Sequence, residues 1–175
     1  MKIIFDKSNK GKARPIRFTY YAIAALLLAF INIVLLDFIA VGTLTPDFLL
    51  ILCVWITITE GQFVGLFAGF LCGILFDVVS HDLIGTNAVA KTVVGFVAGW
   101  FFKEGKANFT LGSYRFLIIV FVCSIVHNLI YNFFYIKSTE IAFLPFFFKY
   151  GLATSLYTTV FAIFGMLIKI PRKGL

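Results

Sequence analysis

The sequence contains few charged residues. Only 13% of its 175 residues are Asp, Glu, Lys or Arg, whereas 61% are hydrophobic. Soluble domains carry roughly a quarter charged residues, so a water-soluble fold of this length would lack the polar surface to cover itself. The apolar runs also lack the alternation of apolar and polar residues that marks membrane barrel strands. The composition therefore predicts an all-α integral membrane protein.

The sequence also lacks the motifs of common catalytic and metal sites. It has no Gly-rich phosphate loop, no His, Cys and Asp cluster with metal-ligand spacing, and no nucleophile in a motif that pairs it with a base. Cys53, Cys72 and Cys123 all fall inside apolar runs, where we expect them to be small buried hydrophobic residues. We therefore expect no enzyme activity, no metal and no cofactor.

The net charge of +7 is concentrated in a few segments. Twelve of the 15 Lys and Arg residues fall in segments expected to be cytoplasmic, which are the basic arm 1–17, the loop 103–115 and the chain end from residue 169 onward. Cytoplasmic segments of membrane proteins carry such an excess of basic residues. This placement favours a bacterial cytoplasmic (inner) membrane protein with both termini in the cytoplasm, and argues against nucleic-acid binding.

The apolar runs predict a compact bundle of six transmembrane helices over residues 18–169, followed by a short cytoplasmic tail, 170–175. A spanning helix needs roughly 20 apolar residues. The expected spans are 18–36, 46–59, 62–80, 84–102, 116–136 and 150–169. At the second span, Thr45 is expected as the N-cap, with Pro46 in the first turn and Asp47 beside the positive helix end. The last span has an ambiguous start, because residues 143–148 are either inside the membrane or along its surface.

Glycines four residues apart form a stripe on each of the third and fourth spans. Such stripes let two helix backbones approach closely, and internal helix packing is the simplest explanation for them. A partner interface is the alternative. The glycines concerned are Gly65, Gly69, Gly73, Gly95 and Gly99.

Two ionisable residues extend these stripes. A charge within a membrane normally has a partner or water, because burying it alone is costly. Asp77 and Lys91 flank the turn near residue 82, so the flexible Lys91 side chain is within reach of Asp77. We expect an intramembrane Asp77–Lys91 pair. The alternative is that Asp77 lies among the outer headgroups and Lys91 extends to the interface alone.

The fifth span has a polar face. Its polar residues step by three and four positions, which places them on one side of a helix. This face is expected to point into the bundle, to line a small polar cavity or to meet a partner. Its members are Ser124, His127, Asn128, Tyr131, Asn132 and Tyr135.

The pattern over residues 46–102 resembles the rod shape-determining protein MreD family of bacteria. The resemblance rests on Pro46-Asp47-Phe48-Leu49-Leu50 at the start of a span, and on a Gly-Phe-x-x-Gly-x-x-x-Asp run from Gly69 to Asp77. Ser80, Leu83 and Gly85 follow. The length, the number of spans and the basic N-terminus agree with this family over essentially the whole chain.

The resemblance implies a non-enzymatic scaffold of the cell-elongation machinery. Proteins of this family associate with MreC, a single-span protein, and through it with MreB filaments and peptidoglycan synthases. The alternative is a substrate-binding subunit of an energy-coupling-factor vitamin or metal transporter. Those subunits are six-helix membrane proteins of similar size, and the MreD family resembles them structurally.

Overall fold

The computed structural model describes residues 13–39, 44–80, 84–136 and 147–169. Within these ranges the fold is all-helical, as predicted. The helices are α1 (Ala13–Ile39), α2 (Phe48–Glu60), α3 (Gln62–Ser80), α4 (Thr86–Gly99), α5 (Ala107–Leu111) and α6 (Tyr114–Ile136). A π-helical turn, η1 (Phe147–Gly151), then leads directly into α8 (Leu152–Ile168).

A helix lies at each of the six ranges expected from the sequence, with two differences. The loop expected at 103–115 contains the short helix α5. The last helix begins with the turn at Phe147 and not at Tyr150. Residues 143–146, for which two placements were open, lie outside the described residues.

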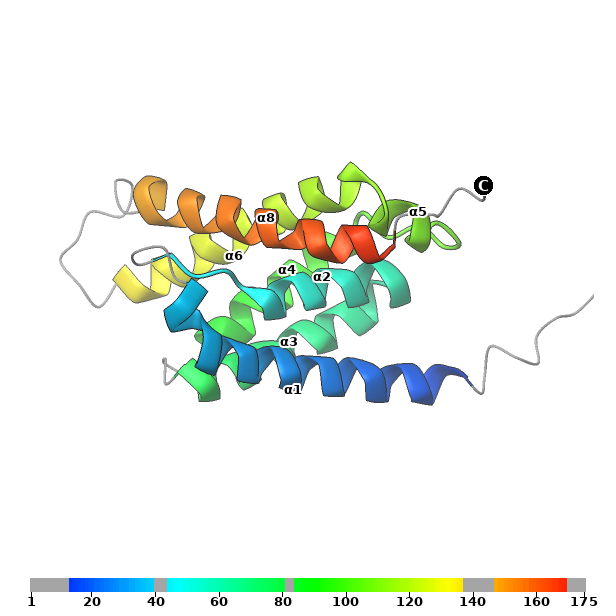
Figure 1. Ribbon diagram of the computed structural model, residues 1–175, viewed down its shortest axis with the longest axis horizontal. Coiled ribbons are helices and arrows are strands. Elements are labelled where there is room, and N and C mark those ends of the chain that lie inside the picture. The colour runs from blue at the N-terminus through cyan, green and yellow to red at the C-terminus, as the bar shows by residue number, and fades with distance from the viewer. Residues whose placement is uncertain (1–12, 40–43, 81–83, 137–146, 170–175) are drawn as a thin grey trace, which may run out of the picture.

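Three helical stretches of the described chain are long and apolar enough to cross a bilayer: Gln62–Ser80, Tyr114–Phe134 and Phe147–Ile168. Two further apolar stretches, Ile16–Asn32 and Phe48–Glu60, are shorter. Length and composition thus support three of the six predicted spans, and the others remain a prediction. The start of α1 and the end of α8 lie at the same end of the bundle, where α5 also lies (Figure 1).

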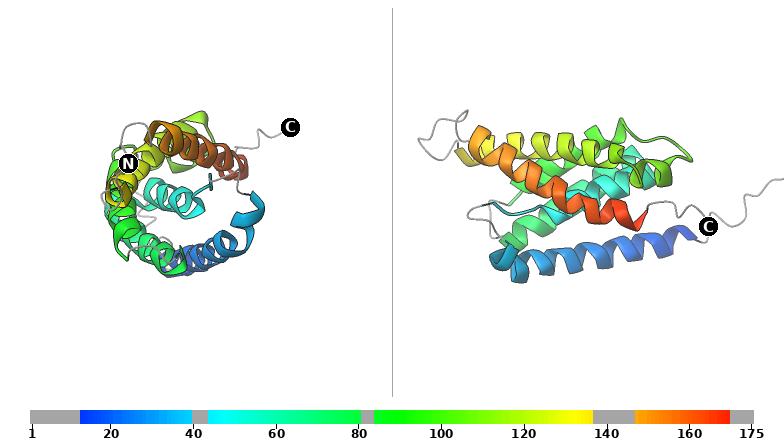
Figure 2. Two further views of the ribbon diagram at one scale, coloured as in Figure 1. Left: turned by 90° about the vertical axis from the view of Figure 1, so that its left-hand side faces the viewer. Right: turned by 45° about the horizontal axis from the view of Figure 1, so that its top comes forward.

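Helix α2 lies at the centre of the bundle. The end-on view in Figure 2 shows it surrounded by the other helices, and it packs against α1, α3, α4, α5, α6 and α8. Every residue of α2 is buried or partly buried, and the fully buried ones include Leu49, Cys53, Ile56 and Ile58. A helix that is hydrophobic all round requires such a buried position. With 13 residues, α2 is only about 20 Å long.

The start of α2 corrects the predicted N-cap. Asp47, and not Thr45, is the N-cap residue, and its Oδ1 accepts a hydrogen bond from the backbone N–H of Leu50 at 2.8 Å. Asp47 has the extended backbone of a cap (φ −96°, ψ 93°). A carboxylate there satisfies one of the free N–H groups of the first turn and faces the positive end of the helix.

At its other end, α2 turns sharply into α3 through Gly61. This glycine has φ 104°, a conformation that residues with a side chain rarely adopt. The turn expected at residues 60–62 is therefore present. It makes α2 and α3 antiparallel neighbours and brings the glycine stripe of α3 against α2 and α4.

One side of α2 lies in an apolar core along most of its length. This core is built from buried residues of α2, α4, α5, α6 and α8: Leu50, Cys53, Val54, Ile58, Val94, Ala98, Leu111, Phe116, Ile119, Val120, Cys123 and Ala162. Ala29 of α1 belongs to a smaller apolar cluster with Leu49 and Cys72. The three cysteines are free and buried, as expected.

Candidate functional site

A cluster of charged and polar side chains lies inside the bundle where α2 begins. It consists of Asp47, Asn87, Lys91 and His127, from the start of α2, from α4 and from α6, and is called the charge cluster below. The Lys91 side chain is fully buried and its Nζ lies 2.6 Å from Oδ2 of Asp47. The same Nζ lies 3.3 Å from Oδ1 of Asn87 and 3.2 Å from Nε2 of His127.

These three contacts match the three N–H donors of an ammonium group. The ring of Phe76 adds a cation–π contact, with Nζ 4.3 Å from the ring centroid. A buried charge is stable only when it is paired and its remaining donors are satisfied. The cluster meets both conditions for Lys91.

His127 makes two hydrogen-bond contacts within the charge cluster and one ring contact beside it. Nε2 of His127 lies 3.2 Å from Nζ of Lys91 and 3.1 Å from Oδ1 of Asn87, within hydrogen-bond distance of both. The His127 ring stacks against Tyr131, one turn further along α6, with centroids 6.1 Å apart. His127 is therefore a hydrogen-bonded structural residue that joins α6 to α4.

Asp47 holds a central position because its atoms serve three helices. Its Oδ1 caps α2, its Oδ2 pairs with Lys91 of α4, and its backbone N–H donates to Oγ1 of Thr158 in α8 at 3.2 Å. The short α2 helix starts inside the bundle, so its positive end requires an acceptor within the protein. Asp47 supplies this acceptor and the counter-charge of Lys91 together.

The predicted Asp77–Lys91 pair is wrong in its carboxylate, because Lys91 pairs with Asp47. Both oxygens of Asp77 instead accept backbone N–H groups at the start of α4, from Gly85 at 2.8 Å, Asn87 at 3.1 Å and Ala88 at 3.3 Å. Asp77 is buried, at 1% exposure, and does not lie among outer headgroups. Asp77, near the end of α3, lies beside the first backbone amides of α4. Its oxygens accept hydrogen bonds from these amides and not from Lys91.

The five glycines of the predicted stripes form one seam between α3 and its neighbours. A Cβ at Gly69 would collide with the carbonyl of Lys91, one at Gly73 with the backbone of Ala88, and one at Gly95 with the carbonyl of Gly65. Gly65 lies against Thr57 of α2, and Gly99 against the side chain of Gln62. The glycines are therefore used for packing within the chain, which leaves no room for a partner helix at this seam.

The predicted polar face of α6 points into the bundle. Ser124, His127, Asn128 and Asn132 are buried, and Tyr131 is partly buried. Asn128 donates to the carbonyl of Gly151 at 3.1 Å and to Oγ of Ser155 at 2.9 Å. Ser155 itself donates to the carbonyl of Gly151 at 2.8 Å. The face thus joins α6 to α4 on one side and to η1 and α8 on the other.

Sequence reasoning missed the role of Asp47 as the counter-ion of Lys91, and the contributions of Ser155 and Thr158. Asp47 was recognised as a residue at a helix start, but its neighbours in space come from α4, α6 and α8. One available signal was the shortness of the apolar run after Asp47. A helix of that length begins inside a bundle of longer helices, so a carboxylate at its start also lies inside the bundle.

These features define a helical membrane protein in which the buried charges of Lys91 and Asp47 neutralise each other. The family described as rod shape-determining protein MreD matches residues 13–172, which is nearly the whole chain. The chain belongs to this family. A search of curated proteins and a search of solved structures each found no match. The expected similarity to substrate-binding subunits of energy-coupling-factor transporters is therefore not supported.

Proposed function

We propose that this protein is a non-enzymatic scaffold of the bacterial cell-elongation machinery, which binds an MreC-like single-span partner within the cytoplasmic membrane. The observation that carries the proposal is the family match over residues 13–172, which supports a role in rod-shape determination. Through the partner, the protein would help to link MreB-like filaments to peptidoglycan synthesis in the lateral wall.

The state of the charge cluster supports a scaffold. Lys91 is completely buried, and its donors go to Asp47, Asn87 and His127. Asp77 accepts backbone N–H groups of α4 and its preceding turn. These charged groups stabilise the bundle and leave no free charge there for a substrate.

The outward helix faces are the surfaces available to a partner helix. On α3 the glycines point inward, whereas Phe63, Phe67 and Leu71 are 81%, 70% and 64% exposed. On α8, Leu156 and Phe164 are 57% and 65% exposed. Helices associate in a membrane through close packing, so a partner span would pack on one of these faces.

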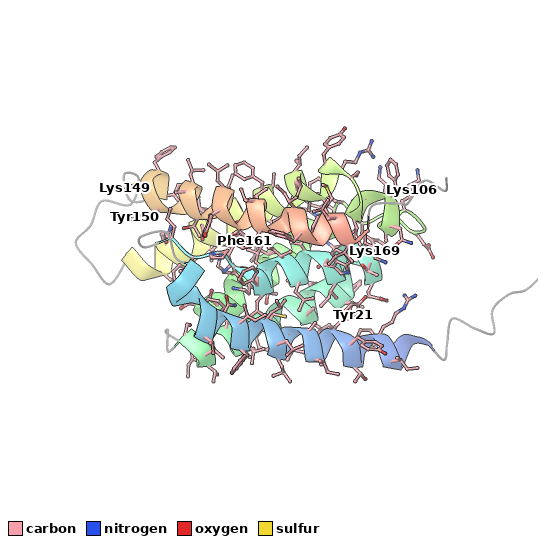
Figure 3. The ribbon with its side chains drawn as sticks, in the orientation of Figure 1. Tyr21, Lys106, Lys149, Tyr150, Phe161 and Lys169 are labelled. Atoms are coloured by element: carbon pink, nitrogen blue, oxygen red, sulfur yellow. The ribbon has the colours of Figure 1, made fainter. Side chains whose placement is uncertain are left out.

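The charge distribution supports the proposed orientation. Basic residues gather at the end where α1 starts and α8 stops, in segments that carry Arg17, Lys103, Lys106, Arg115 and Lys169, while Lys149 of η1 lies at the opposite end (Figures 1 and 3). The positive-inside rule assigns the end with more basic residues to the cytoplasm. Reporter fusions at both termini test this orientation, and an external signal from either terminus would contradict it.

Depletion in a rod-shaped host tests the proposal as a whole. We expect depleted cells to become round and wide, and the wild-type chain to restore rods. The protein should also co-purify in detergent with the single-span partner. Phe67→Ala with Leu71→Ala on α3, compared with Leu156→Ala with Phe164→Ala on α8, will identify the contact face as the one whose variant keeps its expression but loses the partner. Normal rods after depletion, with no partner recovered, would overturn the scaffold.

A further inference from the structure

The short helix α5 (Ala107–Leu111) lies across the end of the bundle where α4 and α8 end and α6 begins (Figure 1). Its inner side is held firmly, because Leu111 is 1% exposed in the apolar core and Thr110 is 8% exposed. Its outer side carries Phe109, which is 59% exposed. The helix is thus anchored on one side and presents an aromatic ring on the other.

Three exposed basic residues surround this helix, one from each segment that meets there. Lys106 is its N-cap residue. The guanidinium of Arg115, at the start of α6, lies over the ring of Phe109, with Cζ 5.4 Å from the ring centroid. Lys169 ends α8, and its backbone carbonyl lies against Gly112, the C-cap residue of α5. Figure 3 shows Lys106 and Lys169 at this same end.

We call α5 with Lys106, Arg115 and Lys169 the basic platform. Exposed aromatic residues precede and follow α5 in the sequence, since Trp100 at the end of α4 and Tyr114 at the start of α6 are each 67% exposed. Aromatic residues of this kind mark the boundary between headgroups and acyl chains. The nearby acid Glu60 is occupied, because it pairs with Arg17 at 3.4 Å and accepts from Tyr21 at 3.1 Å. Glu104 is the remaining acid in the loop that leads to α5.

We propose that the basic platform binds the headgroup of an anionic phospholipid. The phosphate oxygens would accept from Arg115 and from the ammonium groups of Lys106 and Lys169, since Arg and Lys are the usual phosphate-binding residues. Phe109 would enter the adjacent acyl region, as apolar residues of interfacial helices do. The platform carries three basic residues beside exposed aromatic residues of the interfacial kind, so an anionic headgroup fits its charge and its setting.

Trp100 offers a direct test, because the chain contains only two tryptophans. Trp55→Phe leaves Trp100, the C-cap residue of α4, as the sole tryptophan and keeps an aromatic ring against Phe116. This protein is placed in vesicles that contain brominated phosphatidylglycerol or brominated phosphatidylcholine, which quench tryptophan on contact. We expect stronger quenching by the anionic lipid. Lys106→Gln, Arg115→Gln and Lys169→Gln combined should lower the preference for the anionic lipid by up to roughly a hundredfold, since each basic residue near the surface contributes about a factor of five.

Two matched variants complete the test. Lys149→Gln removes an exposed positive charge at the opposite end and should leave the quenching ratio unchanged. Lys106→Arg with Lys169→Arg keeps the charge and should retain the preference. Equal quenching by the two lipids in the Trp55→Phe protein would overturn the proposal, as would a preference that survives the triple substitution. Loss of the preference in millimolar inorganic phosphate would assign the platform to a free anion and so overturn the lipid assignment.

Discussion

The start of helix α2 and its second half lie in opposite environments. The first turn begins at Asp47, beside Lys91 and His127, and its amides and charges are paired across three helices. The last turns place Val54 and Ile58 in the apolar core, with Val94 and Phe116. A single 13-residue helix therefore passes from a polar interior to an apolar one.

The two regions of α2 should respond differently to substitution, because different interactions stabilise them. The apolar end is stabilised by many weak contacts, so the loss of one methyl group removes only a few of them. The polar end is stabilised by mutual neutralisation, so the loss of one partner leaves the other buried and unpaired. We therefore expect small, graded effects in the apolar core and large effects, reversible by a second substitution, in the charge cluster.

Asp47→Asn should have the largest effect. The amide oxygen can still cap α2, but Lys91 loses its counter-charge while it stays fully buried. Breaking a buried pair in this way costs about 3–5 kcal/mol. Equilibrium unfolding of the purified protein in increasing fractions of denaturing detergent measures the loss.

The double variant Asp47→Asn with Lys91→Met tests whether the charge causes this loss. It removes both members of the pair and should recover most of the stability. If its loss instead equals the sum of the two single losses, the residues do not interact and the polar end does not depend on neutralisation.

Gly69→Ala should have the next largest effect, because it lies where the seam approaches the cluster. An added Cβ would collide with the backbone carbonyl of Lys91, so α3 and α4 must separate. Overpacking of this kind costs about 1–3 kcal/mol. Gly165→Ala in α8 is the matched control, because a Cβ there has its nearest neighbour at 3.5 Å, an ordinary contact. Equal losses for both glycines would show that close approach is not the reason for the seam.

Asp77→Ala should cost about 0.5–2 kcal/mol, the usual range for the loss of a helix cap. Asp77 accepts three backbone N–H groups, and no ion pair involves it among the described residues. Asp77→Asn keeps an acceptor and should therefore recover part of the loss. This distinguishes Asp77 from Asp47, where the same change to Asn should be the most damaging. A larger loss for Asp77→Asn than for Asp47→Asn would reverse the assigned roles of the two carboxylates.

The helices and the glycine seam could be predicted from the sequence because they depend on local patterns. Apolar runs gave the six helical ranges, and a spacing of four residues gave the common face of Gly65, Gly69 and Gly73. The inward polar face of α6 followed from the same kind of periodicity. None of these predictions required knowledge of which helices are neighbours in space.

The counter-ion of Lys91 could not be predicted in this way, because it depends on the neighbours of α2. Asp77 was chosen since it is near Lys91 across a short turn, whereas Asp47 is 44 positions away in the sequence. Two facts decide the pairing in the structure. The amides at the start of α4 occupy Asp77, and the central position of α2 brings Asp47 to Lys91. The helix α5 was missed because its five residues are too few for a periodic pattern.

Ile58→Val should have the smallest effect and gives the comparison its lower limit. Ile58 is 1% exposed in the apolar core, so lipid tails cannot fill the space left by the lost methyl group. The expected cost is about 0.5–1.5 kcal/mol, measured by the same unfolding titration. Ile118→Val on α6 is the matched control, because Ile118 is 53% exposed and lipid can replace the missing contacts. We expect almost no change there. Equal losses at Ile58 and Ile118 would mean that burial in the apolar core does not determine the cost. A loss at Ile58 as large as that of Asp47→Asn would mean that the two ends of α2 respond alike, and the distinction between packing and neutralisation would have to be abandoned.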